Sequence, residues 1–550
     1  MFQTVLNHRY LKAVVIILFA LIYCSISLVN HYNFRTYSLD LGVYNNAAYD
    51  FCHFQSNTCT QLLDITENYF ADHFALIPVL VSPLFWIFGS YTMLIVQIVS
   101  ILFGGLGVYK YISTKTESVW LPLLAMIHFF VLWGIYSALA FDYHDNVVAA
   151  MLVPWFLYYF EKENWRATIL FFVLIAVSKE NMALWLVFIC AGLMLMNLKN
   201  KRTVFYLGIL IASAAVYFIV ITKFLMPSLN PHGVLNQLGR YSGLGNDVKE
   251  VAITILTKPA YVWELFIKDE NGIKAEVYFL LFFSGGIALF LRPVFFVMLA
   301  PIFLQKFLTS DQGVWSINGH YSIEFAPILS LALFSLLAGL RSSKLSMTLS
   351  LFSVCITAIA TFVKIENPVP IGYSPVHKQF YKAFHYQREF DVKKINKALE
   401  LIPANARVSA QTEIAPHLAF RDVFYSFPRV DDAEYIVLLK NGNSYPLMND
   451  DYQDRIQDLI YSDDFGVIYN DCDLLIVKKG TLTKQDPGKK IERKMNRERE
   501  KKIGAYERKI RNNGEWLQKL KVAAAEQGCS LDSMLRVNAI YMIGLENAKH

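Results

Sequence analysis

Residues 9–42 read RYLKAVVIILFALIYCSISLVNHYNFRTYSLDLG. A basic flank, Arg9 and Lys12, precedes an apolar run over 13–30 that is too long for the core of a signal peptide. No small-residue cleavage site follows in NHYNFRTY. The run is therefore predicted to remain as the first transmembrane helix, with its basic end in the cytoplasm. An acid, Asp40, stands soon after the chain leaves the membrane.

The chain as a whole has the composition of a multi-spanning membrane protein. Its 550 residues are 55% hydrophobic and 17% charged, with a mean hydropathy of +0.35, whereas soluble domains carry about 25% charged residues. The net charge of +6 is uneven, since residues 489–511 hold eleven Lys or Arg against four Glu. Because this basic excess is local, no nucleic-acid partner is indicated.

Eleven apolar segments reach or approach the length of a bilayer-spanning helix, which is about 20 residues, with ~17 as a practical minimum. They are 13–30, 75–109, 119–140, 146–160, 167–178, 182–198, 203–226, 276–291, 293–309, 322–340 and 345–363. The second is interrupted at Gly89 and Ser90. Its first part, 75–88, is expected to be a short helix kinked at Pro78 and Pro83.

The connections between these segments alternate in charge. The positive-inside rule assigns to the cytoplasm the basic ones, which contain Lys110 and Lys115, Lys162 and Arg166, Lys199, Lys201 and Arg202, Arg292, and Arg341 and Lys344. The alternate connections then lie outside: 31–74, FDYHDN (141–146), SKEN (178–181), 227–275 and SINGHYS (316–322). Every cluster rich in acids or histidines thus falls on one side.

The composition changes after residue 363. The segments ARVSAQT (406–412), AEYIVLLK (433–440) and GVIYNDCDLLIVKK (466–479) are predicted strands. VKKINKALELI (392–402) and YQDRIQDLIYS (452–462) have helical spacing. Residues 364–480 are therefore expected to form a small external α/β domain.

The last 70 residues are expected to form two or three amphipathic helices. Apolar residues follow a spacing of three to four on a charged background: Ile503, Tyr506, Ile510, Leu517 and Leu520. RNNGEW (511–516) marks a stop, and Ser530 is a predicted cap. Their basic face either lies on anionic lipid or is solvated.

The predicted fold class is thus mainly α. A transmembrane helical bundle occupies residues 1–363, the small external α/β domain occupies 364–480, and a charged helical tail occupies 481–550.

Ionisable residues recur in the outer connections, next to apolar segments. They are Asp40; Asp72 and His73; Asp142, His144 and Asp145; Lys179 and Glu180; Arg240 and Tyr241; and His320 with Glu324. Charged groups at a helix centre cost about 2.5–3.5 kcal/mol each on insertion scales, and less at helix ends. Each cluster alone could be an ordinary interfacial group or salt bridge. Their shared side favours one site.

These residue types suit transfer of a sugar from a lipid-linked phosphate donor. A carboxylate can activate the acceptor as a general base, while cationic groups hold phosphate oxygens and stabilise the leaving phosphate. The predicted catalytic residues are Asp40, Asp72 and Asp142, and the predicted substrate-binding residues are His73, His144, Lys179, Glu180, Arg240, Tyr241 and His320.

A divalent metal ion is an alternative use of the Asp and His pairs, and the candidate ligands are Asp72, His73, Asp142 and His144. Their spacing is not diagnostic. Seven cysteines without a CxxC motif do not make a disulfide framework. Cys52 and Cys59 lie in the predicted outer loop, where they either form a disulfide or remain free thiols.

Several linked motifs carry a family resemblance: LDLGVYNNAAYD, ADHFALIPVLVSPLFWIFGS, AFDYHDNVVAAMLVPWFLYYFEKENW, AVSKENMALW and ARVSAQTEIAPHLAFRD. Together they resemble a family of bacterial multi-spanning proteins catalogued as domain of unknown function 2079, over roughly residues 35–480. In that family, Asp72 matches a DHF motif, and Asp142 with His144 matches an FD-H motif.

That family in turn resembles the GT-C glycosyltransferases, integral membrane enzymes that use polyprenyl-phosphate sugars. Their signature is an acid in the first external loop, which Asp40 matches. The contiguous acidic pair that many of them carry is absent, because Leu41 follows Asp40. The charged tail beyond residue 485 lies outside the resemblance.

The resemblance implies an enzyme of the bacterial inner membrane, with a cytoplasmic N-terminus, that glycosylates a lipid, glycan or protein acceptor at the outer face. The rival interpretation is a transporter or flippase of a lipid-linked or polyanionic solute. Transporters usually keep ionisable residues near the bilayer midplane and often have two related halves. Neither feature is visible here. A non-catalytic assembly factor with the same fold is a third possibility.

Overall fold

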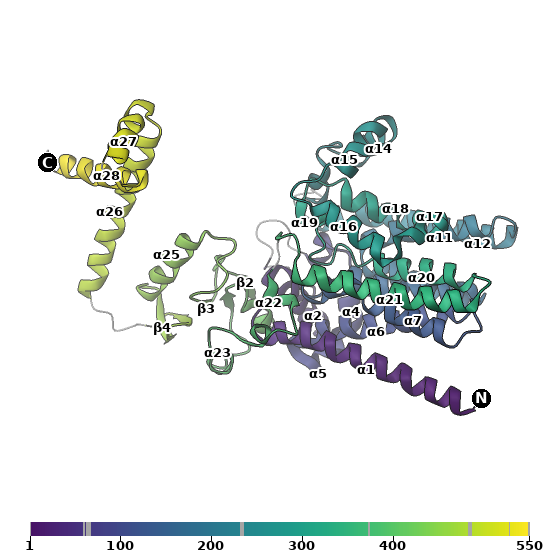
Figure 1. The fold of residues 1–550 in the computed structure, drawn as a ribbon. Helices are drawn as coiled ribbons and strands as arrows, with labels where there is room; N and C mark the ends of the chain where they lie inside the picture. Colours follow the sequence, from purple (N-terminus) through teal and green to yellow (C-terminus); the bar gives the residue numbers. More distant parts are fainter. Residues whose placement is uncertain are drawn as a thin grey trace. The chain divides into compact units, whose positions relative to one another are not determined.

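The computed structural model describes residues 2–58, 61, 68–230, 236–371, 374–481, 487–526 and 529–547. The chain divides into two compact units: residues 1–453 with 468–477, and residues 454–467 with 478–550. Figure 1 shows the helices of the first unit, most of which run side by side as a bundle.

Helices account for most of the first 366 residues. They are α1 Phe2–Tyr32, α2 Val43–Cys52, α3 Tyr69–Asp72, α4 Ile77–Val81, α5 Phe85–Phe88, α6 Thr92–Ile112, α7 Trp120–Phe130, α8 Trp133–Leu139, α9 Asp145–Glu161, α10 Trp165–Ser178, α11 Glu180–Met196, α12 Lys201–Val220, α13 Met226–Leu229, α14 Val248–Thr257, α15 Pro259–Ile267, α16 Ile273–Leu281, α17 Ile287–Leu291, α18 Pro293–Phe307, α19 Gln312–Trp315, α20 Phe325–Ala338 and α21 Ser343–Glu366. Short π and 3-10 turns join some of them, including Ser38–Gly42 and Asn236–Tyr241.

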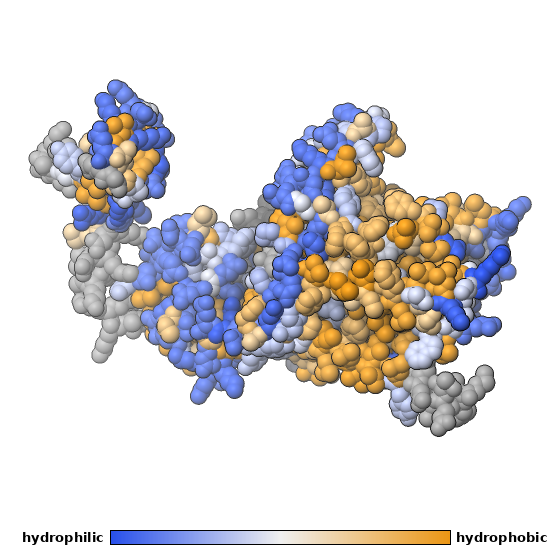
Figure 2. Space-filling model, in the orientation of Figure 1, coloured by the Kyte–Doolittle hydropathy of each residue, from blue (hydrophilic) through white to orange (hydrophobic). Residues whose placement is uncertain are grey.

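Within the described residues, five helical stretches are long and apolar enough to cross a membrane: Tyr10–Tyr32, Ile77–Ile112, Lys201–Leu229, Ile273–Leu291 and Ser343–Glu366. The pair α7 and α8, bent by 46°, makes a sixth if it counts as one span. The apolar helices α10, α11, α18 and α20 are shorter. The hydrophobic residues spread over the bundle surface in Figure 2 agree with this. The predicted multi-pass helical bundle is confirmed.

The predicted interruption near residue 89 is also present. Between α4 and α6 the chain passes through a 3-10 turn, the four-residue α5 and a second turn that begins at Gly89. Gly89 has a φ of +52°, a backbone conformation that glycine adopts without the steric cost of a side chain.

Glycines on α6 let it pack closely against its neighbours. A Cβ atom added at Gly105 would lie 2.2 Å from the Phe130 ring of α7, and one at Gly107 would lie 2.8 Å from the Trp155 ring of α9. Small residues at such positions allow helices to approach within van der Waals contact, which is a main source of helix association in lipid. The start of α9 is held by another residue of α6, because the Gln97 side-chain oxygen accepts from the His144 backbone N–H at 2.9 Å.

The small α/β region contains the strands β1 Val408–Ala410, β2 Phe424–Ser426, β3 Tyr435–Leu439, β4 Phe465–Asn470 and β5 Leu474–Lys479, with the helices α22 Pro375–Lys378, α23 Val392–Leu399, α24 Ala415–Leu418 and α25 Asn449–Ile460. The sheet order is β2-β1-β3-β5-β4. β1 pairs in parallel with both β2 and β3. The predicted strands are confirmed, and β2 is an addition that the sequence did not predict.

The tail forms α26 Pro487–Arg511, α27 Gly514–Glu526 and α28 Leu531–Asn547. Ile510, Leu520 and Leu535 are buried together between these helices. The Ser530 hydroxyl accepts a hydrogen bond from the Ser533 backbone N–H at 3.1 Å, as the predicted cap requires. The three amphipathic helices are therefore confirmed, and they bury their apolar residues against one another.

Candidate functional site

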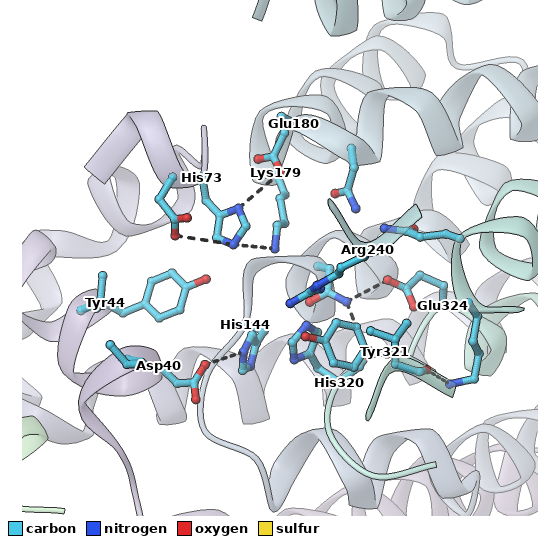
Figure 3. A pocket seen from close by; sticks show the side chains of 18 of the residues that line it. Asp40, Tyr44, His73, His144, Lys179, Glu180, Arg240, His320, Tyr321 and Glu324 are labelled. Carbon is cyan, nitrogen blue, oxygen red and sulfur yellow. Dashed lines mark hydrogen bonds and ion pairs between the residues drawn. The ribbon is translucent and has the colours of Figure 1, made fainter. Parts of the chain in front are cut away.

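A cavity of about 290 Å³ gathers ionisable side chains from sequence-distant parts of the bundle. Its lining includes the predicted residues Asp40, Asp72, His73, His144, Lys179, Glu180, Arg240 and His320. Figure 3 labels all of these except Asp72 and shows the labelled side chains around one space, with Asp40 and His144 facing Lys179 and Arg240. The structure thus brings these side chains from separate connections together in one place.

Asp40 lies in a single π turn, Ser38–Gly42, between α1 and α2. Its carboxylate Oδ1 lies 3.2 Å from His144 Nε2, and its side chain is 29% exposed. Burial lowers the pKa of His144, and the hydrogen bond with Asp40 only partly opposes this. A neutral His144 therefore donates its Nε2–H to Asp40, and the carboxylate keeps acceptor capacity for a second group in the cavity.

His320 stacks on His144 with ring centroids 3.5 Å apart. The pKa of His320 is lowered by burial, by His144 and by Lys179. Its buried Nδ1 atom has no hydrogen-bond partner in the described structure. An unpartnered buried nitrogen beside a cavity is a group that a bound ligand would satisfy.

A second polar cluster closes another side of the cavity. His73 Nδ1 lies 3.4 Å from Glu180 Oε1, and the Lys179 Nζ lies 3.3 Å from His73 Nε2. Burial and Lys179 lower the pKa of His73, but Asp72 and Glu180 outweigh them, and the net direction is upward. The Phe74 backbone N–H donates to Glu180 Oε2 at 3.1 Å. The start of α11 is therefore tied to the loop after α3.

Arg240 borders the cavity from the 3-10 turn Asn236–Tyr241. Its Nε atom lies 3.6 Å from Asp311 Oδ2, with both side chains partly exposed, and its guanidinium lies 5.9 Å from the Tyr321 ring centroid. Exposed pairs of this kind are weak. The guanidinium is thus available to a phosphate or carboxylate, which it binds in a bidentate manner.

Two of the predicted residues do not reach the cavity. Asp142 is buried, and its Oδ2 accepts from the backbone N–H groups of Tyr37 at 2.8 Å and Leu41 at 3.5 Å. Its pKa is raised by burial and by nearby Asp40. Asp142 thus shapes the Asp40 turn from behind. The Tyr241 hydroxyl donates to the Gln305 carbonyl at 2.9 Å, and Tyr241 is not among the residues that line the cavity.

The candidate metal ligands do not come together in a cluster. Across the described residues, the only group of three close ligand types is Asp471, Cys472 and Asp473, a partly exposed turn between β4 and β5. Because Asp142 points to backbone N–H groups, it does not join Asp72, His73 and His144. Whether Cys52 and Cys59 form a disulfide or remain free thiols is not tested, since Cys59 lies outside the described residues.

Several lining residues were not selected from the sequence: Tyr44, Tyr69, Asn146, Asn181, Gln305, Lys306 and Tyr321. Asn146 lies in the quoted segment FDYHDN and donates to Glu324, which the sequence grouped with His320, at 2.8 Å. Lys306 is a lysine in an apolar segment, which is itself a signal of function or of a structural bond. Its Nζ donates to the Val314 and Ser316 carbonyls at 2.8 Å each, so it also holds the connection before α20.

The small α/β region fixes the Asp40 turn. The Ser38 backbone N–H donates to Thr412 Oγ1 at 3.2 Å, and the Ser426 hydroxyl donates to Ser38 Oγ at 2.6 Å. Thr412 follows β1 and Ser426 ends β2. Ligands of parallel sheets usually bind at such carboxyl strand ends. Here the chain's own first connection occupies that place.

A multi-pass helical fold with a polar cavity lined from its inter-helix connections defines the class: this is a polytopic membrane protein. The chain belongs to the family described as Predicted membrane protein (DUF2079), whose sequence model matches residues 30–516. The resemblance to this family is thereby confirmed, but the match runs to residue 516, into the tail that was expected to lie outside it. No curated protein matches the chain.

Proposed function

We propose that this protein is a membrane glycosyltransferase that moves a sugar from a polyprenyl-phosphate donor to an acceptor in the cavity. The observation that carries the proposal is the arrangement of charges around one cavity. The Asp40 carboxylate, which accepts a hydrogen bond from His144, faces the cations Lys179 and Arg240 across it. In this assignment Asp40 removes the acceptor proton, and the cations bind the donor phosphate and stabilise the charge it gains on leaving.

The neutral His144 supports this role for Asp40. Its hydrogen bond orients the carboxylate without neutralising it, because an uncharged imidazole adds no full positive charge. The carboxylate keeps acceptor capacity for a hydroxyl group of the acceptor. His320 Nδ1, buried and without a partner in the described structure, is assigned to a donor or acceptor hydroxyl.

The positions of the charges favour an enzyme over a transporter. Glu180 is the first residue of α11, Glu324 immediately precedes α20, and Asp40 lies in a turn. The cavity therefore gathers helix ends, whereas transporter sites usually lie at the bilayer midplane on broken helices. The positive-inside rule assigns this end to the outer face of the membrane.

The proposal is tested first by binding. The full-length protein in lipid nanodiscs is titrated with undecaprenyl phosphate and followed by native mass spectrometry. Each charge-assisted hydrogen bond contributes about 1.5–3 kcal/mol, so Lys179→Ala and Arg240→Ala are each expected to weaken binding by roughly 10–100-fold. Arg341→Ala, in a basic connection, is the matched control and leaves binding unchanged.

Undecaprenol, which lacks the phosphate, provides the second control and is expected to bind weakly to every variant. Equal affinity for undecaprenyl phosphate and undecaprenol would show that the cavity does not recognise the phosphate group. A transfer assay with a panel of polyprenyl-phosphate sugars then identifies donor and acceptor. Binding without transfer of any sugar would favour the transport interpretation.

A further inference from the structure

The helices α14 and α15 form a short hairpin that protrudes from the bundle (Figure 1). They contain 10 and 9 residues, too few to cross a bilayer, which takes at least ~17. Lys258 alone separates them. The hairpin follows the turn that carries Arg240, so it lies in the same long connection as one side of the cavity.

One side of the hairpin is held against the bundle. The Phe266 ring lies 5.8 Å from the Phe307 ring, and the Tyr278 hydroxyl of α16 donates to the Phe266 carbonyl at 2.6 Å. The Tyr261 hydroxyl donates to the Gly243 carbonyl at 3.2 Å. These contacts fix which face of α15 is turned inward, so its other face is left open.

That other face is apolar and exposed. Ile253 and Leu256 on α14 are 48% and 81% exposed, and Trp263 and Ile267 on α15 are 66% and 58% exposed. Spacings of three and four residues place each pair on one face of its helix. Figure 2 shows hydrophobic residues on this protrusion as well as across the bundle surface.

We infer that α14 and α15 lie in the membrane interface at the cavity end of the bundle, with this apolar face sunk to the boundary of the acyl chains. Interfacial helices bury such a face by ~5–10 Å. Trp263 suits this depth because tryptophan is enriched at membrane interfaces. The exposed lysines Lys249, Lys258 and Lys268 flank the apolar residues and reach the lipid phosphates.

Lipid is favoured over a protein partner by continuity with the surface that already faces the bilayer. The hairpin is bonded to α16, and Ile273–Leu291, which begins with α16, is one of the candidate spans. α16 and the turn after it expose Phe279 and Phe282 at 39% and 63%. The apolar face of the hairpin thus adjoins a helix that meets lipid. This inference holds whether or not the cavity transfers a sugar.

Photo-crosslinking in nanodiscs of the full-length protein tests the inference. The photoreactive residue p-benzoylphenylalanine is introduced at Leu256 or Trp263, and after irradiation the adducts are identified by mass spectrometry. Phe290 of α17, 80% exposed on the bundle, is the lipid-facing reference. Glu264, exposed beside the apolar face of α15, is the matched polar control.

Phospholipid adducts at 256 and 263 are expected at yields close to that at 290 and several-fold above that at 264. Absence of lipid adducts at 256 and 263, with adducts present at 290, would overturn the inference. Adducts of those two positions to a second copy of the chain would overturn it as well, because they would show a protein on this face. Neither outcome depends on the binding of undecaprenyl phosphate.

Discussion

Asp40 and Asp142 both lie in connections between helices, but their side chains have opposite surroundings. Asp40 has a side chain that is 29% exposed to the cavity and bonded to a single imidazole. Asp142 is only 5% exposed and accepts from two backbone N–H groups of the turn that contains Asp40. Asp40 is therefore placed to contact a substrate, and Asp142 is placed to fix the turn that carries Asp40.

The variant Asp40→Asn keeps the shape and most of the hydrogen bonding of the side chain but removes the proton acceptor. Activity in the transfer assay is expected to fall by roughly 10²–10⁴-fold, with thermal stability in detergent unchanged. Asp142→Asn is the paired control and is expected to lower thermal stability along with activity. A stable Asp40→Asn protein with full activity would take Asp40 out of the site.

Buried histidines outside the spans make stability depend on pH. Burial lowers the pKa of His417 to about 3, and burial together with Arg35 lowers the pKa of His377 to about 3. The unfolded chain protonates these groups near 6.5. Because the unfolded state binds more protons below pH 6.5, their contribution to stability is complete above that pH and declines toward pH 3.

The melting temperature in detergent is therefore expected to fall as the pH drops below 6.5, and His417→Phe should flatten this slope. Phenylalanine preserves the ring contacts of His417 with His31 and Phe34, whose centroids both lie 4.1 Å away. His73 acts in the opposite direction, since its raised pKa gives stability that is lost as the pH rises through that value. A slope equal to that of the unmodified protein would exclude His417 as a source.

At the scale of elements, the small sheet is a support for the first inter-helix connection. The carboxyl ends of β1 and β2 hold Ser38, and the Asn45 and Asn46 amides of α2 donate to the Pro416 and Ala419 carbonyls at 3.0 and 2.9 Å. The turn with Asp40 is thus fixed on one side by the bundle and on the other by the sheet.

Ser426→Ala and Ser409→Ala separate this support from general stability. Both serines are buried in the sheet, but Ser409 donates to the Arg429 carbonyl at 2.7 Å and does not contact the turn. Each variant is expected to lose about 1 kcal/mol of unfolding free energy. Only Ser426→Ala should also lower kcat at unchanged donor affinity. Equal kcat values for the two variants would contradict a positioning role.

At the scale of the whole bundle, four of the five basic connections contact one another in pairs, and none of their named basic residues lines the cavity. Lys115 pairs with Glu161 at 2.6 Å, which joins the connections after α6 and α9. A Cβ atom at Gly339 would lie 3.3 Å from the Arg292 guanidinium, which joins those after α17 and α20. Basic connections alternate along the chain with connections rich in acids and histidines. In the structure, the basic connections are separated from the cavity that the acids and histidines line.

This separation predicts the topology in a cell. Residues 142–146 and 178–181 should face outward, and 162–166 and 199–202 inward, but the cavity side chains are largely buried and label poorly. Exposed positions are better probes, so Ser242→Cys is expected to react with an impermeant maleimide on intact cells, whereas Lys162→Cys and Lys199→Cys react only after permeabilisation. Labelling of positions 162 and 242 from the same side would invalidate the orientation.

Much of this protein is determined by the sequence alone. Apolar segment length, the Gly89 interruption, the alternating strands and the spacing in the tail are local properties, and they predicted the helical bundle, the interruption, the strands and the tail helices. They did not predict the 46° bend between α7 and α8, which divides the apolar segment 119–140. The membership of Asp40, His73, His144, Lys179, Arg240 and His320 in one cavity also followed, because charged groups are costly within apolar spans and must gather at helix ends.

Tertiary structure alone decided which way each side chain points. Asp142 and His144 are two residues apart, yet one turns to the backbone of the Asp40 turn and the other enters the cavity. His144 stacks on His320, Ser426 donates to Ser38, and Lys306 donates to the Val314 carbonyl. These contacts join residues up to 388 positions apart. No local sequence pattern indicates such pairs, because they exist only where the packing of the folded chain brings distant residues together.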